Sequence, residues 1–340
     1  MSLFKKIGKF IDDEQVREIR DGFANTGCIP INLLLSGKVD GGIPRRGVTT
    51  LAGDSGYGKT YIALSAAKNF MDDGYSVLWI DSEFAINEDT IKNFGLQKRI
   101  DSEQLKIIGE TNINKIKSLL VNILEEIDRD DKLVIVIDSY SALVTTKSVE
   151  DALKEKEVAD MHTVKKKNEM MTIVNGLAAK KEVPVIVINH VYQEQSAMYP
   201  KTIISGGTKV RYFSNSILLL NSKAKVKDKN GNVIGAMVTA ITDKSRFAKE
   251  QTRMKFYINF TKGLSKYHGL LDSFIDMGLI VKEGKRVYSI ENPDKKWWEK
   301  DIYCDEFFEP LLEKHRDKIE ENFKYKPIKE DFDIVEESYE

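Results

Sequence analysis

The stretch GDSGYGKT, residues 53–60, follows the strand-like run GVTTLA and precedes an apolar helical pattern. It fits the spacing G-x-x-x-x-G-K-[ST], in which backbone N–H groups and the N-terminus of the next helix converge on phosphate oxygens. A chance glycine-rich turn is the alternative, but the strand–loop–helix context favours a nucleoside-triphosphate site. Lys59 should reach the β- and γ-phosphates, and the Thr60 hydroxyl should ligate Mg²⁺. The expected nucleotide-binding residues here are Gly53, Asp54, Ser55, Gly56, Tyr57, Gly58, Lys59 and Thr60.

Short apolar runs alternate with helical patterns around this loop. The expected strands lie at 48–52, 77–81, 133–138, 185–189 and 217–221, and the expected helices at 60–71, 88–94, 114–128 and about 150–181. This alternation predicts an α/β fold, with a mostly parallel central sheet covered by helices on both faces. Beyond residue 221, the turn signature Asn230-Gly231 and the runs 236–242 and 254–260 predict an antiparallel extension of the sheet.

Three further units are expected to flank this core. Residues 2–21 carry apolar side chains at helical spacing, which predicts a short N-terminal helix. From about residue 265, the pattern of a helix and then a hairpin predicts a small α+β C-terminal domain. The acidic stretch 327–340 is typical of a disordered tail. We therefore expect units at 1–30, 31–264, 265–326 and 327–340.

The composition is that of an ordinary soluble protein. The chain has 52 Lys and Arg against 53 Asp and Glu, so its net charge neither supports nor excludes a nucleic-acid partner. Cys28 and Cys304 lie far apart without CxxC spacing, which is typical of buried thiols in a reducing compartment. No apolar run approaches the ~20 residues that a membrane helix needs, and the N-terminus lacks a signal-peptide core. We therefore expect a cytoplasmic protein without a membrane partner.

Polar residues follow three of the expected strands. Asp138 ends the run LVIVID and is expected to complete the Mg²⁺ site, with helix capping as the alternative. Glu83 lies just beyond another strand end and is the expected general base for an attacking water. Asp81 is the alternative base, although it lies nearer the strand and could serve only to cap the turn. His190 follows PVIVIN and is expected to contact the γ-phosphate, unless it only satisfies loop backbone.

The order of these motifs resembles the RecA family of recombinases, and within it the UvsX branch of T-even-like phages. The stretches that carry the resemblance are GDSGYGKT, IDSEFAI, VIVIDSYSAL, VIVINH, SGGTKVRYFSNSILLL and TDKSR. The segments KSVEDALKEKEVADM, DSEFAI and INH favour the phage branch. The resemblance covers about residues 30–290. It implies a RecA-type ATPase core that binds ATP and Mg²⁺, polymerises on single-stranded DNA, and catalyses homologous pairing and strand exchange in recombination, repair and recombination-dependent replication.

The resemblance also implies roles for single residues. His190 takes the place of a glutamine that links the γ-phosphate to the next loop. Lys244 and Arg246, in TDKSR, match a basic pair that reaches the ATP of the neighbouring subunit and assists catalysis there. Exposed basic residues at a strand end are the alternative for this pair. Thr90 lies where bacterial relatives usually stack an aromatic side chain on adenine, so the base preference stays open.

Two loops are expected to face DNA. The first, around 149–160, is acidic, so the run HTVKKK at 162–167 is expected to supply positive charge, with a solvated helix face as the alternative. The second runs from 190 to 207 and carries few charges. Its tyrosine and methionine side chains could stack on bases or wedge between them without reading sequence, or could simply pack. The expected DNA-binding residues are Tyr192, Met198, Tyr199, Lys201, Gly206, Gly207, Lys209 and Arg211.

The two ends of the chain are expected to act in assembly and regulation. The N-terminal helix should dock on a neighbouring core, with Phe23 as a candidate anchor, and the acidic tail should compete with duplex DNA for cations. The partners implied by the resemblance are further copies in a helical filament, single-stranded and homologous duplex DNA, a single-strand-binding protein and a mediator. Two other functions stay open: a RecA-fold ring ATPase or helicase-type motor, and a non-catalytic assembly stabilised by ATP.

Overall fold

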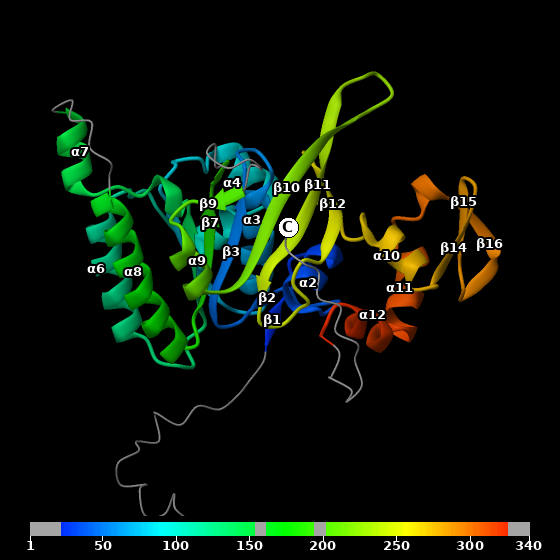
Figure 1. The fold of residues 1–340 in the computed structure, drawn as a ribbon, viewed down its shortest axis with the longest axis horizontal. Coiled ribbons are helices and arrows are strands. Elements are labelled where there is room, and N and C mark those ends of the chain that lie inside the picture. The colour runs from blue at the N-terminus through cyan, green and yellow to red at the C-terminus, as the bar shows by residue number, and fades with distance from the viewer. Residues whose placement is uncertain (1–21, 154–160, 194–201, 326–340) are drawn as a thin grey trace, which may run out of the picture.

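The computed structural model describes residues 22–153, 161–193 and 202–325. Within these segments, a nine-stranded sheet forms the core, in the order β13-β12-β11-β10-β3-β7-β6-β4-β5. The strands from β10 to β5 run parallel, and those from β10 to β13 are antiparallel, which confirms the predicted α/β fold (Figure 1). The strands are β3 (Gly47–Gly53), β4 (Ser76–Asp81), β5 (Leu105–Ile108), β6 (Leu133–Asp138), β7 (Pro184–Asn189), β10 (Ser214–Lys227), β11 (Val233–Ser245), β12 (Arg253–Asn259) and β13 (Gly263–Leu264).

Helices cover both faces of this sheet. On one face, α6 (Ile113–Glu126) and α8 (Met161–Lys180) lie side by side (Figure 1). Helix α6 begins where the Asn112 side chain accepts hydrogen bonds from the backbone N–H groups of residues 114 and 115. It buries Ile116, Leu120 and Leu124, which recur every four residues on one face. The opposite face is covered by α3 (Lys59–Asp72), which follows the glycine-rich loop directly.

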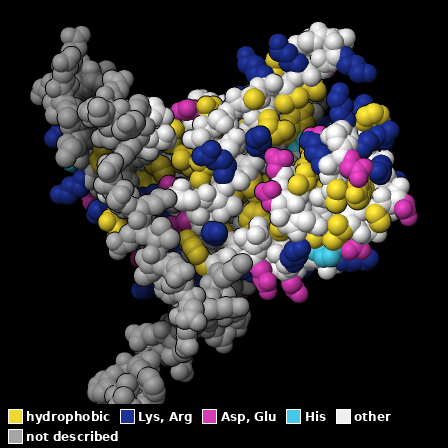
Figure 2. All heavy atoms as spheres, turned by 45° about the vertical axis from the view of Figure 1, so that its right-hand side comes forward, with side chains coloured by type: hydrophobic (Ala, Val, Ile, Leu, Met, Phe, Trp, Pro, Cys, Tyr) yellow, Lys and Arg dark blue, Asp and Glu magenta, His cyan; other side chains and the backbone are white. Residues whose placement is uncertain are grey.

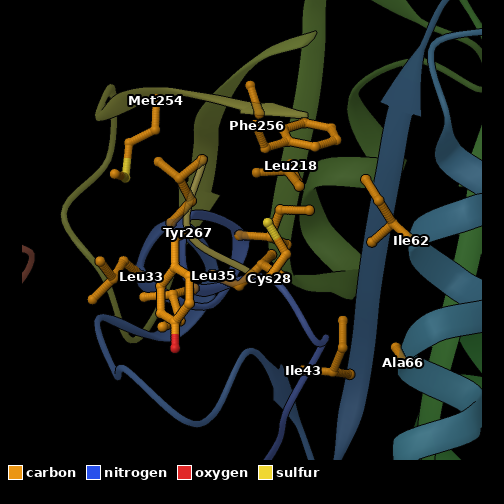
Figure 3. Close-up of a cluster of buried hydrophobic side chains, with 14 of the residues drawn as sticks. Cys28, Leu33, Leu35, Ile43, Ile62, Ala66, Leu218, Met254, Phe256 and Tyr267 are labelled. Carbon is orange, nitrogen blue, oxygen red and sulfur yellow. The ribbon is translucent and has the colours of Figure 1, made fainter. Parts of the chain in front are cut away.

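Helix α2 (Ile29–Ser36) is enclosed by the core, although the sequence pattern did not reveal it. Figure 3 shows Leu33 and Leu35 in one cluster with Met254 and Phe256 of β12, and Ile62 and Ala66 of α3 lie on the other side of this cluster. Every residue of α2 is buried, so it lacks the polar face by which a surface helix is recognised. This helix crosses the expected boundary at residue 30 and packs with the sheet.

A smaller unit follows the sheet. The predicted helix and hairpin after residue 265 are present as α10 (Leu270–Asp276), β14 (Ile280–Glu283) and β15 (Arg286–Ser289). The chain continues through β16 (Asn292–Trp298), α11 (Asp305–Lys314) and α12 (Arg316–Asn322). Helix α12 returns to the core, where buried Glu320 accepts a hydrogen bond from the Val39 N–H and pairs with Lys38.

The expected helix from 150 to 181 is wrong in extent. The structure has α7 (Thr146–Leu153) and α8 as separate helices, and 154–160 lie outside the described residues. The N-terminal helix at 2–21 and the tail at 327–340 also fall outside them. Among the described residues, no helix is both long and apolar enough to cross a membrane. The remaining elements are β1 (Phe23–Ala24), β2 (Ile43–Pro44), α4 (Glu88–Phe94), α5 (Gln97–Asp101), β8 (Val191–Gln193), β9 (Thr202–Ile204), α9 (Thr208–Phe213) and the 3₁₀ turns Tyr140–Ala142 and Glu299–Asp301.

Candidate active site

The glycine-rich loop joins the end of β3 to the start of α3, at the carboxyl edge of the parallel strands. Gly56 and Gly58 have φ angles of 74° and 92°, in the region that favours glycine. A Cβ added to Gly58 would lie 2.1 Å from Ile258 Cδ1, and one added to Gly53 would lie 2.8 Å from the Leu220 carbonyl oxygen. The loop therefore packs against β10 and β12, and larger residues at these two positions would displace it.

A cavity of about 240 Å³ lies in front of this loop. The residues of the loop that line it are Ser55, Gly56, Gly58, Lys59 and Thr60. Gly53, Asp54 and Tyr57 do not line it, and Tyr57 packs against the core instead. The cavity faces the N-terminus of α3, where free backbone N–H groups and the helix dipole favour anions. The predicted loop therefore has the donors and the space that a triphosphate requires.

Lys59 is almost fully buried beneath the loop. Its ammonium donates to the carbonyl oxygens of Gly53 at 2.7 Å and Asp54 at 2.8 Å. Burial lowers the pKa of Lys59, and the carboxylates of Glu83 and Asp138 oppose that shift. This cation is positioned to meet anionic oxygens in the cavity.

Asp138 and Thr60 form a pair of oxygen donors beside the cavity. The Thr60 hydroxyl donates to Asp138 Oδ2 at 3.0 Å, and Asp138 is 2% exposed at the end of β6. Burial raises the pKa of Asp138 to about 7, although the hydrogen bond from Thr60 lowers it. A hydroxyl and a carboxylate beside phosphate-binding groups fit Mg²⁺, which takes one or two protein oxygens together with phosphate and water.

The structure separates the two candidates for the general base. Glu83 lines the cavity, and its Oε1 accepts hydrogen bonds from the Ser139 hydroxyl and His190 Nε2, the latter at 2.9 Å. Burial raises the pKa of Glu83, but these hydrogen bonds and the charges of His190 and Lys59 outweigh it, so the pKa falls below its ordinary value. Glu83 is therefore held ionised, as a base must be.

Asp81 has a structural role instead. Its two carboxylate oxygens accept hydrogen bonds from the N–H groups of Ala85 at 3.2 Å and Ile86 at 3.0 Å. It is 4% exposed and does not line the cavity. This arrangement supports the choice of Glu83 over Asp81.

His190 connects the cavity to the next loop. It lies at the end of β7, lines the cavity and contacts Glu83. Its backbone oxygen accepts a hydrogen bond from Ser205, while the Asn189 side chain donates to the Ser205 oxygen at 2.7 Å. Ser205 follows the hairpin of β8 and β9, so His190 links Glu83 to that hairpin.

Lys244 and Arg246 do not line this cavity. The Lys244 ammonium donates to the carbonyl oxygens of Arg211 and Ser214, and Arg246 is exposed at the end of β11. Burial lowers the pKa of Lys244, and Arg246 and Arg211 lower it further. Within one subunit the pair is therefore apart from Glu83, and a catalytic role would require a second copy.

The described part of the second loop that was expected to face DNA is a short hairpin and a turn. Tyr192 is 53% exposed on β8, and Gly206 and Gly207 have positive φ angles before α9. Lys209 is exposed on α9, whereas the Arg211 guanidinium already pairs with Asp243. Met198, Tyr199 and Lys201 lie outside the described residues.

Several residues near the cavity were missed in the sequence. Phe260, Ile258 and Ala236 form its apolar wall, and Phe260 is 42% exposed. An aromatic residue at the end of the run 254–260 was the only signal. Thr90 does not line the cavity, and its N–H donates to the Asn87 side chain that caps α4. Phe260 is therefore the better candidate for contact with a base.

Comparison with known proteins agrees with this geometry. A model of the RecA N-terminal domain matches residues 9–265. The recombination and repair protein of Enterobacteria phage T4 is 31% identical, covering 84% of this chain and 74% of the phage protein. Protein RecA of Mycoplasma genitalium is 25% identical over 83% of this chain and 79% of its own length. The DNA repair and recombination protein RadB of Thermoplasma acidophilum is 29% identical over 53% of this chain and 69% of its own length. The chain therefore belongs to the RecA family of recombination proteins.

Proposed function

We propose that this protein is an ATP-dependent DNA recombinase, which forms helical filaments on single-stranded DNA and catalyses homologous pairing and strand exchange in recombination and repair. The observation that carries the proposal is the contact between Glu83 in the nucleotide cavity and His190 at the base of the β8–β9 hairpin. A recombinase must couple its nucleotide state to DNA binding, and this contact joins the two regions. The family match supports recombination over a ring motor of another class.

ATP with Mg²⁺ would supply the phosphoanhydride bond that is hydrolysed. Lys59 and the loop amides would bind the phosphates, and Thr60 with Asp138 would hold the metal ion. Glu83 would accept a proton from water, which its lowered pKa permits near neutral pH. His190 contacts the same carboxylate, so a change in the position of Glu83 would be transmitted through His190 to the proposed DNA loop.

Hydrolysis would be completed by a neighbouring subunit. Lys244 and Arg246 lie at the end of β11, outside the cavity of their own subunit, and would act on the ATP of the next copy. Such a head-to-tail contact generates a helical filament when it does not close. Cations from a second subunit would stabilise the charge that develops during phosphoryl transfer.

The DNA would lie against the second loop. Tyr192, Lys209 and the glycine pair 206–207 offer an aromatic face, a cation and backbone N–H groups that do not depend on base sequence. Met198, Tyr199, Lys201 and Arg211 complete the proposed surface. A homologous duplex, a single-strand-binding protein and a mediator are the further partners that we propose, in the cytoplasm of a host cell.

The first test is phosphate release from ATP with and without long single-stranded DNA. We expect strong stimulation by DNA, and Glu83→Gln should abolish both the basal and the stimulated rate. Turnover that ignores DNA would contradict the coupling through His190. If Glu83→Gln left turnover intact, Glu83 would not be the base, whereas ATP binding without any turnover in the unaltered protein would indicate a non-catalytic assembly.

A further inference from the structure

The β10–β11 hairpin extends past the parallel part of the sheet. The pairing of β10 with β3 ends at Leu220 and Gly53, but β10 continues to Lys227. The hairpin projects beyond the sheet in Figure 1, and Figure 2 shows Lys and Arg side chains gathered at this end of the molecule. Exposed lysines occur at every second position along the extension, at 223, 225, 227 and 229.

The base of this hairpin lies on the cavity side of the sheet. Lys225 pairs with Ala236 across β11, and Ala236 pairs with Ile258 across β12. Directly paired residues share one face of a sheet, and Ala236 and Ile258 line the nucleotide cavity. Lys223 shares this face, because it lies two residues from Lys225 on the same strand.

Lys223 reaches the glycine-rich loop itself. Its ammonium donates a hydrogen bond to the Gly56 carbonyl oxygen at 2.6 Å. The loop's other close approaches to the antiparallel strands, Gly53 to Leu220 and Gly58 to Ile258, are steric. The contact from Lys223 is charged and directional, so it can fix the orientation of one peptide group.

That orientation matters for phosphate binding. An anion site made of backbone needs its N–H groups turned inward, so its carbonyl groups must turn outward and find other partners. The Lys59 ammonium, below the loop, donates hydrogen bonds to the carbonyl oxygens of Gly53 and Asp54. Gly56 has a φ angle of 74°, and its carbonyl group is held from the hairpin side by Lys223.

We propose that Lys223 is a positioning residue for nucleotide binding, which holds the glycine-rich loop in its phosphate-binding conformation from the β10–β11 hairpin. The proposal rests on the proposed nucleotide site but not on recombination. Through Lys223, the hairpin would contribute to nucleotide affinity, and the sequence motif of the loop alone does not predict this contribution. Lys223 would act on the ground state, so it should affect binding rather than the chemical step.

The test compares three variants of the full chain. Lys223→Ala removes the contact, Lys223→Arg keeps a donor with the same charge, and Lys227→Ala removes the same charge further along the hairpin. The Lys227 side chain is exposed and has no hydrogen bond or ion pair to any residue that the structure describes. Affinity for ADP is measured by calorimetry without DNA, and KM and kcat for ATP are measured with saturating DNA.

We expect Lys223→Ala to weaken ADP binding and raise KM by about 3- to 10-fold, the size typical of one net hydrogen bond at a solvent-exposed position, with kcat changed less than about 2-fold. Lys223→Arg should restore most of the affinity, and Lys227→Ala should match the unaltered protein. Equal affinities for Lys223→Ala and Lys227→Ala, whether both unchanged or both weakened, would overturn the proposal. A fall in kcat without a change in affinity would also overturn it.

Lys59→Ala separates this proposal from the nucleotide site on which it rests. If Lys59→Ala binds ADP normally, the assigned nucleotide site is wrong, and the role of Lys223 falls with it. If Lys59→Ala fails to bind while Lys223→Ala binds normally, only the role of Lys223 is wrong. Weakened binding in Lys223→Ala supports the proposal even if DNA does not stimulate turnover.

Discussion

Asp138 should make the nucleotide-free protein less stable than a variant that cannot ionise at this position. Its carboxyl group is 2% exposed, and burial raises its pKa from 3.8 to about 7. Because the pKa of Asp138 is higher in the folded than in the unfolded state, the contribution of this carboxyl group to the free energy of unfolding is fully present below pH 3.8. It is lost as the pH rises to about 7. Each pKa unit corresponds to about 1.4 kcal/mol, so the loss at pH 8 is at most about 4 kcal/mol.

The perturbation is Asp138→Asn, which keeps an oxygen to accept the hydrogen bond from Thr60 and removes the charge. In EDTA and without nucleotide, we expect the variant to be more stable than the unaltered protein by up to about 4 kcal/mol at pH 8, and by less than about 2 kcal/mol at pH 5. The assay is urea unfolding followed by tryptophan fluorescence, because Trp79 is fully buried in the neighbouring strand β4. ATP turnover in Mg²⁺ should fall in the same variant.

Asp81→Asn is the matched control. Asp81 pairs with Asp138 across β4 and β6 and is also buried, but its two carboxylate oxygens accept backbone hydrogen bonds. An amide has only one acceptor oxygen, so this variant should lose about 1–3 kcal/mol of stability. The reasoning would be refuted if Asp138→Asn were less stable at pH 8, or if its advantage were the same at pH 5.

Three further predictions concern catalysis. Glu83→Gln should lower kcat by at least about 100-fold while leaving ADP affinity within about 2-fold, because only the base is lost. A fall in ADP affinity as large as the fall in kcat would contradict this. Ser139→Ala removes a hydrogen bond that lowers the pKa of Glu83, so the acid limb of the pH–kcat profile should move to higher pH. Ser141→Ala is its control, because it contacts Ser139 but not Glu83. Lys59→Ala and Arg246→Ala should each be inactive alone, yet an equal mixture of the two should recover about a quarter of the unaltered rate. In random head-to-tail contacts, a quarter of the sites combine an intact Lys59 from one subunit with an intact Arg246 from the next. No recovery would place Arg246 outside the neighbour's site.

The sequence predicted the bounds of the strands more accurately than those of the helices. The expected strands at 133–138 and 185–189 differ from the observed strands by at most one residue, because each is an apolar run buried on both faces. Strand β10 was expected to end at 221 but extends to Lys227, since its polar hairpin extension lacks that apolar signal. Helix α2 was missed because burial on all sides removes the polar face.

The sequence by itself determined the chemistry at the ends of the parallel strands. The glycine-rich loop, Asp138, Glu83 and His190 each follow a recognisable apolar strand, and parallel strands bring their carboxyl ends to one edge. That rule needs only local patterns, so these residues could be placed together without coordinates. The sequence favoured Glu83 over Asp81 as the base but left Asp81 open, because the two lie two positions apart near the end of the same strand.

Only the tertiary structure shows what each of the two carboxylates contacts and which residues from distant strands reach the site. Asp81 turns to its own loop, whereas Glu83 faces Ser139 and His190. Phe260 and Lys223 come to the glycine-rich loop from strands far along the chain. Such contacts depend on the packing of the antiparallel strands against the loop, and no spacing in the sequence encodes that distance.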